Sequence, residues 1–226
     1  MAFIDVILLL INSREIWEIA GLSVFISITA VLISILIGIP VGVYLGLRRD
    51  KNSMLLTAIL NTAMGLPPVL VGLVVYIMIS RNGPLGSLQI LFTPIAMILA
   101  QAILTMPIII GVTRSSIRAL PSDFSETVLS FGATKRQLFF ITIDESRYDI
   151  MIAIILAFGR AVSEVGAILI VGGNIRFHTR VLTTAIITEI SKGRNDIALA
   201  LGLILLSISY SVTLLMTRIQ MKTNQE

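Results

Sequence analysis

Two opposite charges lie four residues apart inside a long apolar stretch of the chain. Arg160 and Glu164 fall in segment 148–172, where Asp149 is the only further charge. In a continuous helix, residues at this spacing share a face and can pair. Charges inside a bilayer are costly and usually face a bundle interior or a wet cavity. The spacing therefore predicts either an ion pair that fixes helix packing or a subunit interface, or an arginine that lends compensated positive potential to an anion pathway.

A second group of residues has the pattern of a docking element. Segment 116–143 separates two apolar stretches and carries helix-start signals from Pro121 onward. Gly132 then interrupts the apolar periodicity, and segment 133–140 predicts a second short amphipathic helix. Two short helices joined at a glycine form a compact knob. The pattern predicts either docking to a partner or a helix pair that lies on lipid.

Residue types that the chain lacks exclude several chemistries. There is no Gly-x4-Gly-Lys-Ser/Thr phosphate loop, so the chain is not expected to bind and hydrolyse ATP itself. There is no cysteine, and the single histidine, His178, excludes a multi-histidine metal site. His178 lies between Arg176 and Arg180 and is expected to be a solvated surface residue. We expect no catalytic residue, metal or cofactor in this chain.

The composition predicts an all-α integral membrane protein. Hydrophobic residues make up 56% of the 226 positions and charged residues 13%, about half the usual share. The mean hydropathy is +0.97. A membrane helix needs about 20 mainly apolar residues, and five segments qualify: 19–47, 53–80, 91–113, 148–172 and 197–218. They form one membrane domain, 19–218, and predict a multi-pass protein of the cell membrane.

The positive charges orient these spans. The basic turn 48–51 between the first two spans belongs in the cytoplasm by the positive-inside rule. Five crossings then place the N-terminus outside, with ten of the 17 Lys and Arg residues inside and six outside. The positive-inside rule already explains why basic residues gather in short loops, so nucleic acid is not expected as a partner. Segment 1–18 predicts an interfacial segment without signal-peptide features, and 219–226 a cytoplasmic tail.

Glycine and proline interrupt the predicted spans. Pro67 and Pro68 predict either an ordinary kink or a helix break beside a pathway, because proline frees backbone carbonyls that protein or water must satisfy. Gly172, Gly173 and Asn174 mark the outer end of the fourth span, where small residues allow close helix packing. The outside segment that follows contains a short apolar run, 181–190, which predicts a helix folded back on the mouth as a gate.

Five residues of the predicted knob stand out together: Glu126, Thr127, Phe131, Gly132 and Ala133. Their order, with a Gly six positions after a Glu, resembles the EAA loop of type I ABC transporter permeases, the membrane subunits of ATP-driven importers. The resemblance implies that they form a coupling helix that inserts into an ATPase subunit.

The loop departs from the family pattern in two places. Thr127 and Val128 replace two alanines, and segment 142–145 stands where the family usually has Ile-x-Leu-Pro. Four further segments resemble the molybdate, sulfate and tungstate permeases of this class, and their sequences are most similar to those of the tungstate permeases. They are 65–72, 80–86, 158–174 and 179–187, so the resemblance covers nearly the whole chain.

The resemblance implies the membrane subunit of an importer for tungstate or a similar oxyanion. It implies a homodimer with one pathway at its interface, two ATPase subunits that bring ATP and Mg, and an extracytoplasmic oxyanion-binding protein, all set in membrane lipid. Alternating access would move the anion. Two alternatives remain: the same architecture for molybdate, sulfate or another solute, and a non-transporting membrane scaffold that recruits a soluble partner through its loop.

Overall fold

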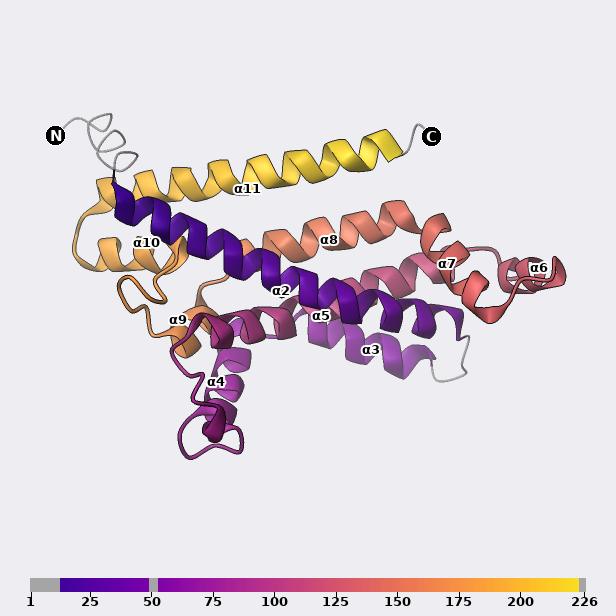
Figure 1. Cartoon of the computed structure of the whole chain (residues 1–226), viewed down its shortest axis with the longest axis horizontal. Coiled ribbons are helices and arrows are strands. Elements are labelled where there is room, and N and C mark those ends of the chain that lie inside the picture. Colours follow the sequence, from indigo (N-terminus) through magenta and orange to yellow (C-terminus); the bar gives the residue numbers. More distant parts are fainter. Residues whose placement is uncertain (1–12, 49–52, 224–226) are drawn as a thin grey trace.

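A computed structural model describes residues 13–48 and 53–223, and it contains no strand within those ranges (Figure 1). Residues 1–12 of the predicted interfacial segment and 49–52 of the basic turn lie outside the described part. The elements are α2 (Arg14–Leu47), α3 (Ser53–Met64), α4 (Pro68–Ile79), η1 (Gly86–Leu88), α5 (Pro94–Ala119), α6 (Phe124–Ser130), α7 (Lys135–Glu145), α8 (Arg147–Val162), α9 (Gly166–Gly172), α10 (Leu182–Ser191) and α11 (Asn195–Thr223).

The long helices account for the predicted spans. Helices α2, α5 and α11 are each long and apolar enough to cross a membrane. Two helix pairs, α3 with α4 and α8 with α9, pass the same test when each pair is taken as one bent span. Five candidate spans result, in agreement with the five apolar segments. The first and last helices are longer than predicted, because α2 begins at Arg14 and α11 continues to Thr223.

Of the two alternatives at the double proline, an ordinary kink or a helix break, the structure has the break. Helix α3 ends at Met64, α4 begins at Pro68, and the two axes differ by 88°. Proline suits the first turn of a helix because its missing N–H would have no partner there. Figure 1 shows α4 turned away from the long axis along which α2, α8 and α11 run.

The fourth span was predicted as one continuous helix over 148–172, and this prediction is wrong. Helix α8 ends at Val162, α9 begins at Gly166, and the two are bent by 56°. The bend lays α9 against α4: a Cβ on Gly72 of α4 would lie 2.7 Å from the Cα of Ala167. Glu164 therefore does not follow Arg160 on the same helix but lies in the break after it.

A seam of glycines joins α2 to α5. A Cβ on Gly42 would lie 2.8 Å from the Cβ of Thr113, and the same crowding recurs one turn earlier at Gly38 and one turn later at Gly46. Small residues at this spacing let two membrane helices approach until their backbones nearly touch. The second halves of α2 and α5 therefore form one tightly packed pair.

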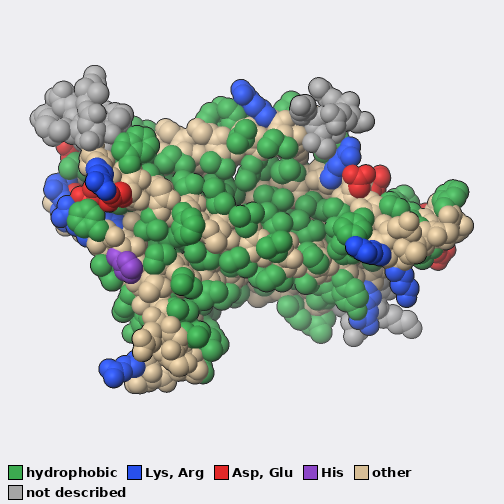
Figure 2. Space-filling view, in the orientation of Figure 1, with side chains coloured by type: hydrophobic (Ala, Val, Ile, Leu, Met, Phe, Trp, Pro, Cys, Tyr) green, Lys and Arg blue, Asp and Glu red, His purple; other side chains and the backbone are tan. Residues whose placement is uncertain are grey.

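The surface has the distribution that a bilayer requires. Hydrophobic side chains cover the middle of the molecule, and most visible charged side chains lie towards its two ends (Figure 2). Large apolar side chains such as Leu36, 74% exposed, and Leu206 face outward from α2 and α11. The protein is thus a multi-pass membrane protein whose exposed middle suits lipid better than water.

We expect Gly72→Ala to lower the free energy of unfolding by about 1–3 kcal/mol, the usual range for overpacking. The added methyl would meet the backbone of Ala167, which cannot move without shifting α9. Gly202→Ala is the matched control, because among the described residues only the local backbone of α11 lies near its Cβ position. Thermal unfolding in detergent measures both variants, and an equal melting temperature for the two would contradict the packing argument.

Candidate functional site

The predicted knob is an exposed elbow at one end of the molecule. Helix α6 ends at Ser130, Gly132 has a φ of +83°, and α7 begins at Lys135. This backbone region is open to glycine without steric cost. Apart from its chain neighbours, no described residue has an atom within 4 Å of a Cβ on Gly132, so the backbone conformation rather than crowding requires the glycine. Phe131 is 87% exposed at the tip of the elbow.

The remaining predicted loop residues also lie towards solvent. Glu126 and Thr127 are exposed on α6, and Ala133 is half-buried after the turn. Asp123 occupies the N-cap position of α6, but its side chain makes no capping hydrogen bond. The structure thus brings the five predicted residues into one small, accessible surface.

Helix α7 anchors the elbow to the spans. Its start is fixed by a capping box, in which Thr134 N–H donates to Gln137 Oε1 at 2.8 Å and Gln137 N–H donates to Thr134 Oγ1 at 3.3 Å. Leu138 and Thr142 are buried, whereas Phe140 is exposed. The apolar residues of the loop therefore serve two purposes, one set packing inward and the other left open.

The base of the loop is tied together by polar contacts that the sequence analysis did not predict. Ser116 Oγ on α5 donates to Asp149 Oδ2 on α8 at 2.6 Å, joining the helices that enter and leave the loop. Arg114 Nη1 donates to Thr57 Oγ1 of α3 at 2.9 Å. A displacement of the elbow would therefore be transmitted to α5 and α8 together.

Segment 142–145, where the loop departs from the family pattern, continues α7 to its end at Glu145. Thr142 Oγ1 donates to Leu138 O at 2.7 Å, and Arg147 pairs with Asp144 at 3.1 Å. Ser146 alone separates α7 from α8. The exit from the loop is therefore a tight helix-to-helix junction.

The two intramembrane charges face each other across the end of α8. Arg160 Nη2 lies 3.9 Å from Glu164 Oε2, with side chains 36% and 4% exposed. Glu164 Oε1 also accepts a hydrogen bond from Ala167 N–H at 3.1 Å, which fixes the carboxylate at the break. Arg160 is the accessible partner. A half-exposed arginine at membrane depth needs water or another protein surface beside its guanidinium group, because lipid would not solvate the charge.

The two helix breaks adjoin. A Cβ on Gly166, the first residue of α9, would lie 2.8 Å from Cγ2 of Val69, directly after Pro68. Hence the bend after Pro67 and the bend around Glu164 meet at the α4–α9 contact. Sequence reasoning treated these features separately, and only the packing of α9 on α4 brings them together.

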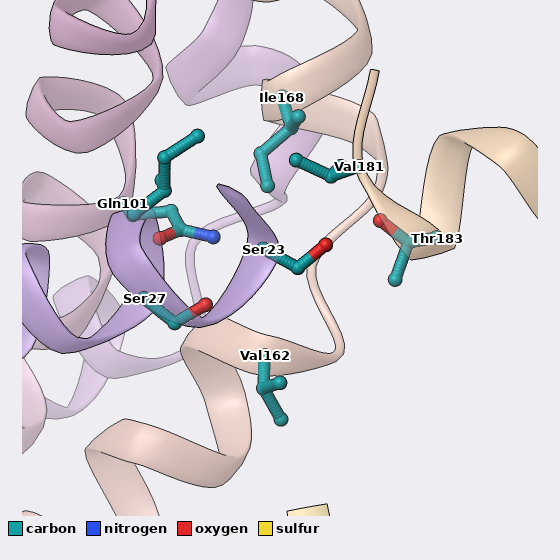
Figure 3. Close-up of a pocket in the computed structure, with 8 residues that line it drawn as sticks. Ser23, Ser27, Gln101, Val162, Ile168, Val181 and Thr183 are labelled. Carbon is teal, nitrogen blue, oxygen red and sulfur yellow. The ribbon is translucent and has the colours of Figure 1, made fainter. Parts of the chain in front are cut away.

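Side chains from other helices satisfy the backbone at the fourth-span break. Gln101 Nε2 on α5 donates to Ala161 O at 2.8 Å, and Thr183 Oγ1 on α10 donates to Glu164 O at 3.0 Å. A cavity of about 10 Å³ lies beside them, and Ser23 and Ser27 of α2 also line it (Figure 3). Sequence reasoning missed this cluster. The available signal was Gln101, an amide within an apolar span, where polar residues are usually bonded inside the bundle.

The end of the fourth span, after α9, is a polar turn. Gly173 has a φ of +69° and Asn174 a φ of 51°. Asn174 Nδ2 donates to Thr188 Oγ1 at 2.7 Å, and Arg180 Nε donates to Asn174 Oδ1 at 3.2 Å. The predicted apolar run 181–190 forms α10, and the turn residues connect α9 to it.

A charged groove lies beside this turn. Arg176 donates two hydrogen bonds to Glu15 of α2, at 2.8 and 2.7 Å. The carboxylate raises the pKa of Arg176 through these hydrogen bonds and its charge. A space of about 290 Å³ is lined by Glu15, Phe177, His178 and Arg180 among others, and His178 is exposed as expected. Among the described residues, no three His, Cys, Asp or Glu side chains gather as a metal site would require.

This arrangement defines a class of protein: a multi-pass helical membrane protein with paired helix breaks within its candidate spans and a helical elbow at one end. The family described as the binding-protein-dependent transport system inner membrane component matches residues 38–225. The chain belongs to this family.

Three relatives show where in the family the chain lies. It is 42% identical over 206 residues to the tungstate uptake system permease protein TupB of Peptoclostridium acidaminophilum, covering 91% of this chain and 90% of that protein. It is 40% identical over 218 residues to the probable anion ABC transporter permease protein of Haloferax volcanii, covering 94% of each. Identity to the molybdenum transport system permease protein ModB of Escherichia coli is 27% over 209 residues, covering 85% of this chain and 91% of that protein.

A solved structure has the same fold. A bacterial ABC transporter involved in import of the acidic polysaccharide alginate matches with a TM-score of 0.75 at 18% identity, covering 96% of this chain and 83% of that one. The match confirms the arrangement of helices.

We expect Gln101→Leu to lower the free energy of unfolding by about 0.5–1.5 kcal/mol, because Ala161 O would lose the hydrogen bond from the Gln101 amide and keep only its backbone donors, such as Glu164 N–H. Ser207→Ala is the control, since the Ser207 hydroxyl donates to Leu203 O within α11. Thermal unfolding in detergent separates the two. If both variants melt alike, the hydrogen bond to the break does not stabilise the fold as argued.

Proposed function

We propose that this chain is the membrane-spanning permease subunit of an ATP-driven importer for tungstate or a similar oxyanion. The observation that carries the substrate is the similarity to a tungstate permease and a probable anion permease over at least nine-tenths of each chain. The sequence has no phosphate loop, so a separate ATPase must supply the energy. The exposed elbow supports this proposal because it offers a surface on which such a subunit can dock. The proposed complex contains two copies of this chain, two ATPase subunits that bind ATP and Mg, and an extracytoplasmic oxyanion-binding protein.

The elbow is the proposed attachment point for the ATPase. Glu126, Thr127, Phe131, Gly132 and Ala133 form its accessible surface. Phe131 supplies a large apolar anchor of the kind that dominates protein interfaces. Since Ser116 and Asp149 join α5 to α8 at the base of the loop, a pull on the elbow moves both spans.

Transport follows from coupling two conformations to two ligands. ATP binding closes the ATPase pair, draws the two elbows together and opens the pathway outward. Hydrolysis and product release return it inward. Each ligand shifts this equilibrium only by the difference in its affinity for the two states.

The proposed anion pathway passes the half-exposed face of α8. Arg160 attracts a dianion, and Glu164 compensates its charge so that the anion can leave again. Gly159 precedes Arg160, and the described residues leave its Cβ position open within 4 Å. A second copy of the chain would cover this face and leave an aqueous path between the two. The adjoining break at Pro67 and Pro68, and the outer turn of Gly172, Gly173 and Asn174, are the proposed gate elements.

Molybdate is the main alternative substrate, since a molybdenum permease is also a relative, at lower identity. Uptake of radiolabelled tungstate in competition with molybdate and sulfate distinguishes these anions. A non-transporting scaffold is the alternative of another class, and it predicts no uptake at all.

We expect Gly132→Val to uncouple ATP hydrolysis from transport. A branched residue at a φ of +83° is strained, so the elbow would not keep its shape in the ATPase. Gly132→Asn is the control, because asparagine tolerates the left-handed region. The chain is reconstituted in vesicles with its ATPase and substrate-loaded binding protein, and uptake and hydrolysis are measured together. Normal uptake by Gly132→Val would refute the coupling role of the elbow.

We expect Arg160→Gln to slow anion uptake at least several-fold while the complex still assembles, because the amide keeps the bulk but removes the charge. Arg81→Gln, outside the bundle on the turn after α4, is the matched control. Initial uptake rates in reconstituted vesicles give the result. An unchanged rate in Arg160→Gln would remove this residue from the pathway.

A further inference from the structure

The break between α8 and α9 leaves backbone carbonyls at membrane depth that α8 itself cannot satisfy. A helix that stops leaves its last carbonyl groups without partners in the helix. In hydrocarbon these groups must be satisfied by protein or water. Glu164 O is satisfied by the hydroxyl of Thr183, which comes from α10.

Thr183 lies at a joint of three elements. Its neighbour Leu182 donates its backbone N–H to Ser23 Oγ of α2 at 2.8 Å. The side chains of Thr183 and Ser23 are both buried. Figure 3 shows Ser23 from α2, Val162 and Ile168 from either side of the break, and Thr183 from the start of α10 around one small cavity. The start of α10 is therefore bonded to two spans at once.

The chain just before this joint forms the outer loop. Thr179 Oγ1 accepts from Ile175 N–H at 3.0 Å and donates to Gly172 O, which folds the loop on itself. Arg176 and Phe177 on the same loop are exposed. One compact segment thus has a solvent-facing edge and an inner end that reaches the break.

Glu164 is the residue that this inner end holds. Its carbonyl accepts from Thr183, its carboxylate accepts from Ala167 N–H, and the same carboxylate faces Arg160. A displacement of α10 would therefore change the position of Glu164 relative to Arg160.

We propose that Thr183 is a positioning residue that transmits docking of the extracytoplasmic binding protein on the outer loop, 173–181, to Glu164 at the fourth-span break. The partner presses on the loop, α10 shifts, and the Thr183–Glu164 hydrogen bond moves the break. The inference rests on the proposed function, because it requires a binding protein outside and an ATPase inside.

The test uses the complete complex of permease, ATPase and tungstate-loaded binding protein in nanodiscs. Thr183→Val keeps the shape of the side chain and removes the hydroxyl, whereas Thr183→Ser keeps the hydroxyl. The readout is the stimulation of ATP hydrolysis by the loaded binding protein, divided by the basal rate. We expect Thr183→Val to lose about five-fold or more of this stimulation, the lower end of typical coupling between sites. The basal rate stays unchanged, and Thr183→Ser behaves as wild type.

Two further variants make the result specific. Thr29→Val makes the same chemical change where the hydroxyl donates to Phe25 O within α2, and it should leave stimulation intact. Ser23→Ala breaks the neighbouring bond of the joint and should also lose stimulation, which keeps the inference testable if Thr183→Val does not assemble.

The outcomes separate the inference from the function beneath it. Full stimulation of Thr183→Val, or of Ser23→Ala where Thr183→Val does not assemble, overturns the positioning role. Equal losses in Thr183→Val, Thr183→Ser and Thr29→Val also overturn it. If loaded binding protein does not stimulate the wild-type complex, the proposed function itself fails.

Discussion

One constraint governs this structure: inside a bilayer, every backbone N–H and C=O must find its partner within the protein or in trapped water. The continuous helices α2, α5 and α11 meet it along most of their length, although Pro40 and Pro107 have no N–H to donate. The fourth span meets it differently, because it stops at Val162 and restarts at Gly166. Gln101 and Thr183 supply hydrogen bonds to the carbonyls of Ala161 and Glu164. The break can exist at that depth because two other helices, α5 and α10, supply donors to it.

The same constraint makes the broken region a suitable place for movement. A regular span loses several hydrogen bonds if it bends, whereas a break held by a few side chains can exchange partners at lower cost. The tightly packed α2–α5 seam, where glycines leave no room for a Cβ, is the stiff counterpart. At one end this frame carries the outer loop and α10, and at the other it carries the elbow of α6 and α7 (Figure 1). This arrangement suits a protein in which a conformational change at α10 is transmitted to the elbow at the other end of the molecule.

Several elements were predictable because their signals are local. Each of the five spans is a run of apolar residues, Gly132 interrupts a helical pattern, and proline at 67 and 68 cannot continue a helix. The apolar run 181–190 formed α10 as expected. The fourth span was predicted as one helix because its sequence is mainly apolar on both sides of Arg160 and Glu164, with no proline to mark the bend. The contacts that bend it, Gly72 against Ala167 and Thr183 on Glu164, join residues distant in the chain.

By itself, the sequence determined that this protein is a helical membrane protein, where its spans lie, and that an elbow interrupts them. These properties follow from hydropathy and backbone chemistry, which act over a few residues. The tertiary structure alone decided that the two helix breaks adjoin, that Glu164 is buried while Arg160 stays accessible, and that α10 bonds to the break. Their physical reason is packing: once α9 lies on α4 and α10 on α2, side chains far apart in sequence become the partners that a broken helix needs.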